Sequence, residues 1–210
     1  TVSPWHQRTL AQYNPNTHLI YNGYDAHTFY PKTLVIESFD ITFIGKYYSH
    51  YQDCPRLLFA ALQSLITTNQ IAVDEVKVHF YTNAVGQADF AKLAKEYTLD
   101  NVVRVHNYIP RNEIVDRMHH SSIMLVLTTP IKQYGTHGMM GTKFYEILGV
   151  EKPCLCLNSD EECLAEAIKN THAGLAATHV EDVKAFILEK YQEWKAKGYT
   201  HQLVINKEQF

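Results

Sequence analysis

The stretch IMLVL at residues 123–127 is an uninterrupted apolar run, and the glycine-rich segment YGTHGMMGTKFYE follows it at residues 134–146. A short, fully apolar run of this kind predicts a strand that is buried on both faces of a sheet. The glycine-rich segment leads into a helical pattern over about 142–150, and CLCL at 154–157 predicts the next strand. This order of strand, loop, helix and strand is typical of a parallel α/β sheet.

The same alternation extends over the rest of the chain. Strands are predicted at residues 18–21, 40–44, 76–81, 102–106, 123–127 and 154–157. Apolar stripes at helical spacing predict helices at about 4–13, 55–68, 90–97, 114–118, 142–150, 160–170 and 180–197. Right-handed crossovers between buried parallel strands favour a doubly wound topology. We therefore predict an α/β fold, a Rossmann-like three-layer sandwich with a parallel sheet.

Length and composition exclude several classes of protein. The 210 residues suffice for one domain with a sizeable core, at about 150 residues per domain. The formal net charge of −3 argues against nucleic acid as the main partner. The run at 123–127 is far shorter than the ~20 apolar residues of a membrane helix. The four cysteines indicate buried thiols in a reducing compartment, which favours the cytoplasm.

The first part of the chain differs from the rest. Residues 1–37 contain turn-rich sequence such as NGYD at 22–25, and we interpret them as a linker segment. Residues 38–210 then form the Rossmann-like domain. Because ligands of such sheets bind beyond the carboxyl ends of the strands, the loops after Ile44, Tyr81, His106 and Leu127 are the candidate site.

The glycine-rich segment is the first candidate binding element. Glycines allow a ligand to approach the backbone, and the free amides at the start of a helix beginning near Thr142 favour a phosphate group. The spacing matches neither a P-loop nor GxGxxG, which disfavours ATP hydrolysis and the usual dinucleotide fingerprint. The alternative is an ordinary surface loop followed by a helix, in which Lys143 and Glu146 form a surface salt bridge of little energetic weight.

The second candidate is Gly45-Lys46, where the strand at 40–44 ends in a glycine followed by a cation. Taken alone, Lys46 is interpreted as a solvated loop lysine, and it indicates a site only in combination with the glycine-rich segment. Other familiar sites lack their residues, because the sequence has no HExxH, GxSxG or paired CxxC motif. Cys154 and Cys156 fit two buried thiols of a strand better than a metal site.

Several passages together resemble, in order, the C-terminal, nucleotide-sugar-binding domain of GT-B glycosyltransferases, most closely the retaining family-4 type. They are VSP at 2–4, IYNGYD at 20–25, FYP at 29–31, DITFIGK at 40–46, NYIP at 107–110, GTKFYE at 141–146, KP at 152–153 and AGL at 173–175. The resemblance implies the C-terminal half of a GT-B two-domain fold and a hexosyltransferase-like, retaining enzyme that binds a nucleoside-diphosphate sugar.

The resemblance also implies roles for individual residues. Glu146 would contact the ribose hydroxyls, and the diphosphate would be held by Gly45, Lys46 and the amides of Gly141, Thr142 and Lys143. Asn107, Tyr108 and Ile109 would flank the base. Lys46 would also stabilise the charge of the departing phosphate, and no metal would be needed.

One position departs from the family pattern. The family commonly has a glutamate eight residues before the ribose glutamate, whereas this chain has Gly138 there, with His137 beside it. His137 or Thr136 would then face the donor sugar, and we include His137 among the candidate catalytic residues.

The resemblance implies a partner as well. The N-terminal acceptor-binding domain of the family would precede Thr1, so we expect the chain alone to be inactive. Any membrane contact would come through that missing half, at the inner membrane face in the full-length protein. The expected role is bacterial surface polysaccharide synthesis. Two alternatives are a sugar-nucleotide epimerase on the same scaffold and a non-catalytic nucleotide-binding module, since fold does not fix function.

Overall fold

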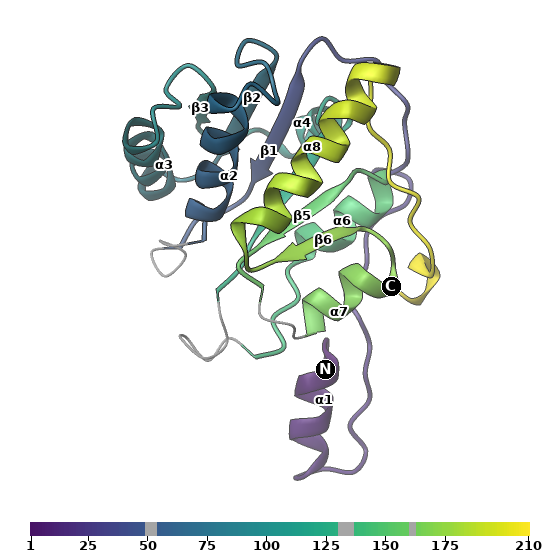
Figure 1. Ribbon diagram of the computed structural model, residues 1–210. Coiled ribbons are helices and arrows are strands. Elements are labelled where there is room, and N and C mark those ends of the chain that lie inside the picture. Colours follow the sequence, from purple (N-terminus) through teal and green to yellow (C-terminus); the bar gives the residue numbers. More distant parts are fainter. Residues whose placement is uncertain (49–53, 130–136, 160–162) are drawn as a thin grey trace.

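The computed structural model describes residues 1–48, 54–129, 137–159 and 163–210. Six parallel strands form one sheet in the order β3-β2-β1-β4-β5-β6 (Figure 1). The strands are β1 (Phe39–Ile44), β2 (Val76–Tyr81), β3 (Val103–His106), β4 (Ile123–Leu127), β5 (Cys154–Leu157) and β6 (Gly174–Ala177). This is the doubly wound order, in which the chain changes direction across the sheet between β1 and β4.

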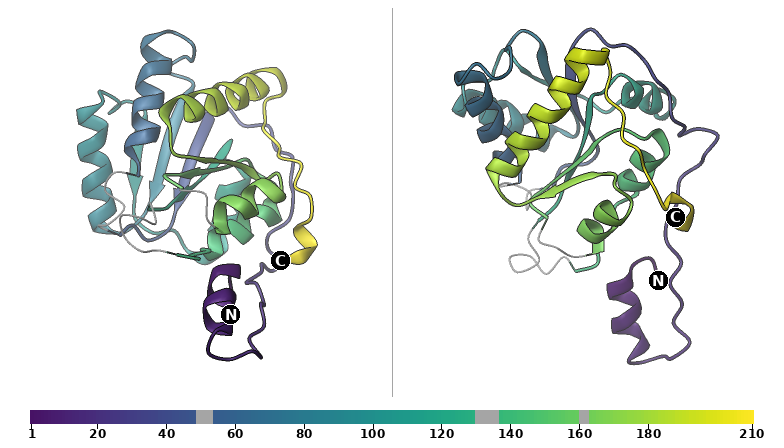
Figure 2. Two further views of the ribbon diagram at one scale, coloured as in Figure 1. Left: turned by 60° about the horizontal axis from the view of Figure 1, so that its bottom comes forward. Right: turned by 45° about the vertical axis from the view of Figure 1, so that its right-hand side comes forward.

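Helices cover both faces of the sheet (Figure 2). They are α1 (Pro4–Ala11), α2 (Arg56–Thr67), α3 (Ala84–Glu96), α4 (Arg111–His119), α6 (Thr142–Val150), α7 (Cys163–Asn170) and α8 (Val180–Lys197), and a 3-10 turn η2 (Lys207–Gln209) follows. The helices α2, α3 and α8 pack on one face, and α4, α6 and α7 pack on the other. The predicted Rossmann-like three-layer sandwich is therefore confirmed.

Two apolar clusters, one on each face of the sheet, make the core. On the α2, α3 and α8 face, Phe39 and Ile41 of β1 are fully buried against residues such as Leu62 and Ile187. On the other face, Met124 of β4 packs with the apolar side of α6. Successive side chains of a strand point to opposite faces, so β1 and β4, which are buried throughout, supply both clusters.

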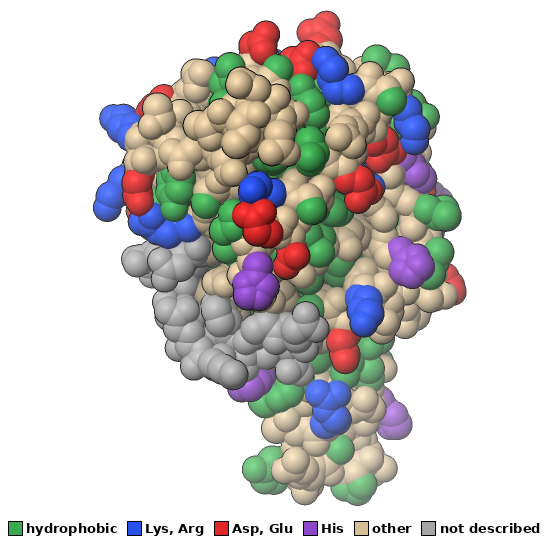
Figure 3. All heavy atoms as spheres, viewed as in Figure 1, with side chains coloured by type: hydrophobic (Ala, Val, Ile, Leu, Met, Phe, Trp, Pro, Cys, Tyr) green, Lys and Arg blue, Asp and Glu red, His purple; other side chains and the backbone are tan. Residues whose placement is uncertain are grey.

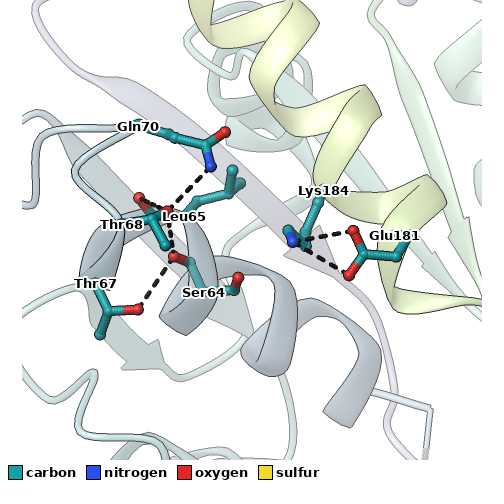
Figure 4. Close-up of polar contacts among 7 residues, drawn as sticks. All are labelled: Ser64, Leu65, Thr67, Thr68, Gln70, Glu181 and Lys184. Carbon is teal, nitrogen blue, oxygen red and sulfur yellow. Dashed lines mark hydrogen bonds and ion pairs between the residues drawn. The ribbon is translucent and has the colours of Figure 1, made fainter.

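The contact of α2 with α8 closes one side of the sandwich. At the end of α2, the hydroxyl groups of Thr67 and Thr68 donate hydrogen bonds to the carbonyl of Ser64, and Gln70 donates to Thr68 (Figure 4). The same carbonyl of Ser64 also accepts the backbone N–H of Thr68 at 3.1 Å, so these bonds reinforce the last turn of the helix. On the facing α8, Lys184 pairs with Glu181.

The prediction of the sheet was wrong in two respects: one predicted strand does not form, and one observed strand was not predicted. Residues 18–21 form no strand, because their backbone meets the chain end instead of a neighbouring strand: Ile20 N donates to Thr1 O at 2.8 Å, and the Thr1 amine donates to His18 O at 3.0 Å. Conversely, β6 was not predicted, because GLAA lacks the β-branched and aromatic residues that mark strands. The helix predicted at 4–13 ends at Ala11.

The segment before β1 lies largely outside the sandwich. In Figures 1 and 2, α1 projects from the body of the molecule, and the chain returns to β1 through residues 12–38, which contain no helix or strand. Tyr24 and Phe29 lie against α6, where Gly149 leaves room for them. The division into a linker at 1–37 and a domain at 38–210 stays a prediction.

The four cysteines are buried and form no disulfide, as expected. Burial raises the pKa of the Cys156 thiol to about 12. Within the described part of the chain, no helix combines the length and the apolar character that a bilayer crossing requires.

Candidate functional site

The loops that follow β1, β2 and β3 begin side by side. Ile44 pairs with Tyr81 in the sheet, and Tyr81 pairs with His106. Gly45 N donates to Tyr81 O at 3.0 Å, which extends this alignment one residue into the loop. In a parallel sheet the carboxyl ends of all strands share one edge, so Thr128, directly after β4, and the start of the crossover helix α6 lie at that edge as well.

The loop after β1 presents a cation. Lys46 is exposed, and its Nζ lies over the ring of Tyr48 at 4.9 Å from the ring centre. Tyr47 is buried, and its backbone N–H donates to Asn83 Oδ1 at 3.0 Å. The buried tyrosine therefore fixes the loop while Lys46 points outward. A Cβ added at Gly45 would make only ordinary contacts with the Phe43 ring, so this glycine is not required by packing.

Within the described parts of the chain, no group accepts a hydrogen bond from the N–H groups of Thr142 and Lys143 at the start of α6. Gly141 is the N-cap residue and supplies no side-chain hydrogen bond, and Gly141 and Thr142 are exposed. The first N–H groups of a helix have no partner within the helix, and their dipoles favour an anion. The helix has no acidic side chain in its first turn to neutralise that field.

Lys143 and Glu146 form the ion pair that their spacing suggested. Lys143 Nζ lies 2.6 Å from Glu146 Oε2, and the two side chains are 31% and 19% exposed. The pair is thus half-buried rather than fully solvated. No described residue bonds to Glu146 Oε1, so this carboxylate retains acceptor capacity for a ligand hydroxyl.

The segment after β3 combines a polar and an apolar surface. Asn107 is exposed and accepts a hydrogen bond from Gln87 of α3 at 3.0 Å. Tyr108 is 55% exposed, whereas Ile109 packs against the α6 side of the core. An exposed aromatic ring and a fixed amide are groups that a planar base can contact.

Next to this segment, three polar side chains from β3, β2 and β1 contact one another across the sheet. His79 Nδ1 lies 3.0 Å from His106 Nε2, and His79 Nε2 lies 3.4 Å from Asp40 Oδ2. His106 stacks on Tyr81, and the Arg117 guanidinium also lies over the Tyr81 ring. Burial lowers the pKa of His106, and the charges of His79 and Arg117 lower it further. At neutral pH the end of β3 therefore carries a neutral imidazole beside the candidate base site.

His137 is tied to α1. Its ring stacks on the Trp5 ring with 4.9 Å between centres and 13° between planes. Its Nδ1 is buried and has no hydrogen-bond partner in the described ranges. Thr136, the other residue expected near the donor sugar, lies outside the described residues.

Three residues of this region were missed by the sequence analysis. Asn83 and Gln87 hold the loops after β1 and β3, and Trp5 contacts His137. Asn83 follows a predicted strand directly, which was a usable signal. Trp5 had none, because its contact joins parts of the chain that are far apart in sequence. In the described ranges, no three potential metal ligands converge.

Comparison with known proteins links this fold to a class of enzymes. No protein-family model matches the sequence, and no curated protein matches it. Among solved structures, S. aureus TarM in complex with UDP aligns over 94% of this chain and 38% of its own, with 13% identity and a TM-score of 0.68. WaaB, a lipopolysaccharide outer core galactosyltransferase, aligns over 95% of this chain and 53% of its own, with 12% identity and a TM-score of 0.64.

A third similar structure is a single domain. The C-terminal domain of LpcC, a group 1 glycosyl transferase from Francisella tularensis, aligns over 84% of this chain and 99% of its own, with 12% identity and a TM-score of 0.55. The chain thus spans 38% of TarM and 53% of WaaB but nearly all of this domain. Together with the strand order and the two helical layers, these alignments show that the chain has the fold of GT-B glycosyltransferase domains.

Proposed function

We propose that this chain is the donor-binding, C-terminal half of a retaining, family-4-like glycosyltransferase. One observation carries the proposal: an α6 N-terminus without a side-chain cap, an exposed lysine and a half-buried carboxylate follow β4 and β1, the neighbouring strands between which the sheet reverses its strand order. A nucleoside diphosphate has a matching set of groups, with two phosphates and a pair of ribose hydroxyls. TarM, which has the same fold, was solved with UDP.

The proposed roles follow from the chemistry of the departing nucleotide. When the bond to the sugar breaks, negative charge builds on the distal phosphate, and Lys46 together with the amides of Gly141 to Lys143 stabilises it. Glu146 accepts hydrogen bonds from the ribose, for which Oε1 is available. Asn107, Tyr108 and Ile109 flank the base, and His137 contacts the sugar. Gly45 lets the diphosphate approach the backbone of the loop after β1.

This arrangement supplies the positive charge without a divalent ion, and we propose that binding needs none. The partner is an N-terminal acceptor domain that forms the other wall of the cleft. The proposed setting is the cytoplasm, at the inner membrane face when that domain is present. The proposed pathway is bacterial surface polysaccharide synthesis, which is consistent with the fold shared with WaaB.

A binding screen tests the proposal. The chain is titrated with UDP, GDP and their hexose derivatives, in EDTA and again in Mg²⁺, while thermal unfolding is followed. A ligand at 100 times its dissociation constant stabilises by about 2.7 kcal/mol. We expect stabilisation by one nucleotide series in EDTA. A chain that binds no nucleotide contradicts the proposal, and binding only with Mg²⁺ contradicts its metal-free form.

A further inference from the structure

The helix α1 touches the domain chiefly through its first turn. None of its residues is buried, and its far end exposes Leu10, with Tyr13 following at 84% exposure. Figure 3 shows this segment standing out from the body of the molecule. Ser3 and Trp5 at its near end behave differently, because Ser3 is fully buried and Trp5 packs against the α6 side of the core.

The first contact of this turn is the Trp5 and His137 ring stack. Among the described residues His137 Nδ1 is buried without a hydrogen-bond partner, so no polar contact holds this side of the imidazole in place. A buried unpaired nitrogen costs free energy, so without a compensating contact another arrangement of His137 would be favoured. The stack on Trp5 supplies that contact.

The second contact is at Gly138. This residue has φ of +67°, and a Cβ there would lie 2.6 Å from Ser3 Oγ and 3.0 Å from Trp5 Cβ. Ser3 in turn shares a 2.7 Å hydrogen bond with His6 Nδ1 and accepts one from His6 N. The backbone at 138 is therefore pressed against a turn that is itself fixed by a capping serine. Glycine is the residue that allows both the conformation and the approach.

These two contacts lie within reach of the proposed phosphate site. Gly138 is three residues before Gly141, so at most about 11 Å of extended chain separates them. A diphosphate on the α6 amides has its sugar on the outer phosphate, one group farther along the ligand. The segment His137–Gly138 is thus close enough to meet the sugar, whereas the base site at Asn107 to Ile109 follows a different strand.

We infer that the first turn of α1 is part of the donor site: Trp5, acting through His137, positions the His137–Gly138 segment against the hexose of the nucleotide sugar. Trp5 is a positioning residue in this scheme. The inference rests on the proposed function and deepens it, because it assigns recognition of the sugar, as distinct from the nucleotide, to a segment that precedes the Rossmann-like domain.

The test measures the nucleotide and the nucleotide sugar separately. Calorimetric titrations with the best nucleotide of the screen, and with its hexose derivative, are made on the wild type, Trp5→Ala, Trp5→Phe and Leu10→Ala. We expect Trp5→Ala to weaken binding of the nucleotide sugar about 3- to 10-fold, in line with the loss of one aromatic stack, and to leave the nucleotide unchanged. Trp5→Phe retains a ring and should restore most of the affinity. Leu10→Ala, on the exposed part of the same helix, should have no effect.

Two further measurements test the stack even if Trp5→Ala is less stable than the wild type: a double-mutant cycle and the indole N–H resonance of Trp5. In a cycle with His137→Ala, the two single losses and the double loss should be non-additive, because both break the same contact. Trp5 and Trp194 are the two tryptophans of the chain, and Trp194 is buried in the opposite cluster. The indole N–H resonance of Trp5, assigned with Trp5→Phe, should shift on addition of the nucleotide sugar while that of Trp194 stays in place.

Three results are decisive. If the wild type binds neither ligand, the proposed function fails. If the wild type binds both ligands but Trp5→Ala changes neither affinity, or weakens both equally, this inference alone is overturned. Additive effects in the cycle, or a Trp5 resonance that ignores the sugar, likewise overturn the role of the stack.

Discussion

At the scale of single residues, Glu146 and His106 each have a contact within the protein and a further group that can interact with a second partner. Glu146 binds Lys143 through one carboxylate oxygen and leaves the other available. His106 is shared between the ring of Tyr81 and the imidazole of His79. Substitutions that preserve shape and change charge therefore separate a binding role from a structural one.

Glu146→Gln distinguishes ribose binding from a simple ion pair. If both ribose hydroxyls donate to the carboxylate, the amide should weaken nucleotide binding by about 1.5 to 3 kcal/mol, because charge-assisted hydrogen bonds are lost. If Glu146 only pairs with Lys143, the change should cost less than about 1 kcal/mol of stability and leave binding intact. Calorimetric titration of wild type and variant decides, with a 2′,3′-dideoxy nucleotide as the control ligand. Equal affinities of the two proteins would reject the ribose role.

His106 makes a prediction about acid stability. Because burial lowers its pKa in the folded protein, the unfolded chain binds the proton more readily, and stability is lost as pH falls below the ordinary histidine pKa of about 6.5. His106→Phe keeps a ring against Tyr81 and removes the titrating group. The variant should therefore lose less thermal stability than the wild type between pH 7.5 and 5.5.

The control for this change is His18→Gln, at an exposed histidine that should leave the acid sensitivity as it is. Some sensitivity should remain in the His106 variant, because burial also lowers the pKa of His119. Unfolding curves of wild type and His106→Phe with the same pH dependence would show that His106 is not the group responsible.

At the scale of secondary structure elements, two glycines that look alike in sequence differ in what surrounds them. Gly174 begins β6 with φ of +151°, and a Cβ there would lie 2.0 Å from Cys154 O of the neighbouring strand. At Gly141, the N-cap of α6, a Cβ would meet nothing within 4 Å. One glycine is required by a close backbone approach, and the other is not.

We expect Gly174→Ala to destabilise the fold by more than about 3 kcal/mol, because the strand cannot pair without moving. Gly141→Ala is the matched control and should cost only about 1 kcal/mol, the usual loss when alanine replaces a favoured N-cap residue. Denaturant unfolding of both variants measures these differences. A Gly174 variant as stable as the Gly141 variant would contradict the packing argument.

The turn between α6 and β5 holds a buried cation. Lys152 is 2% exposed, and burial lowers its pKa to about 8, while Glu193 opposes this shift. The folded protein thus binds this proton less tightly than the unfolded chain, and stability should rise as pH increases from about 8 toward 10.5.

Lys152→Met keeps the length of the side chain and removes the charge. We expect it to stabilise the fold at pH 7 by about 1 to 3 kcal/mol, because the cost of burying the ammonium is removed. Denaturant unfolding at pH 7 and pH 10 provides the measurement, and the gain should shrink at the higher pH. Lys77→Met, at an exposed lysine of β2, is the control. A destabilised Lys152 variant would mean that the ammonium has a partner worth more than its burial costs.

At the scale of the whole molecule, the proposed function makes the candidate site one wall of a cleft. The residues proposed for phosphate, ribose and base follow β1, β3 and β4 at one edge of the sheet, and the chain spans 38% to 53% of TarM and WaaB. A cleft enzyme positions its two substrates between walls, and this positioning accounts for a large part of the rate. Donor binding and sugar transfer should therefore be separable.

We predict that the isolated chain binds a nucleotide sugar and transfers no sugar. The measurement is release of nucleotide from the donor in the presence of candidate acceptors, compared with calorimetric binding of the same donor. Lys46→Ala is the control for specific binding and should weaken the nucleotide affinity. Sugar transfer by the isolated chain at an enzymatic rate would refute the one-wall interpretation.

The sequence by itself determined the parallel α/β class of the fold and five of the six strands of the sheet. The strands at 76–81, 123–127 and 154–157 and the helices at 142–150 and 180–197 were predicted with the observed bounds. These elements have strong periodicity and clear end signals, which are local properties of a chain. The Lys143 and Glu146 pair was predicted for the same reason, because residues three apart share a helix face.

Tertiary structure alone decided the features that depend on distant neighbours. Residues 18–21 have the pattern of a strand but no strand beside them, while the weak pattern at 174–177 became β6 because the exposed edge of β5 was there to pair with it. The first turn of α1 packs against residues 137–138. This packing produces the stack of Trp5 on His137 and the need for glycine at 138. Strand pairing and contacts between segments depend on which surfaces meet in space, and a local sequence pattern does not contain that information.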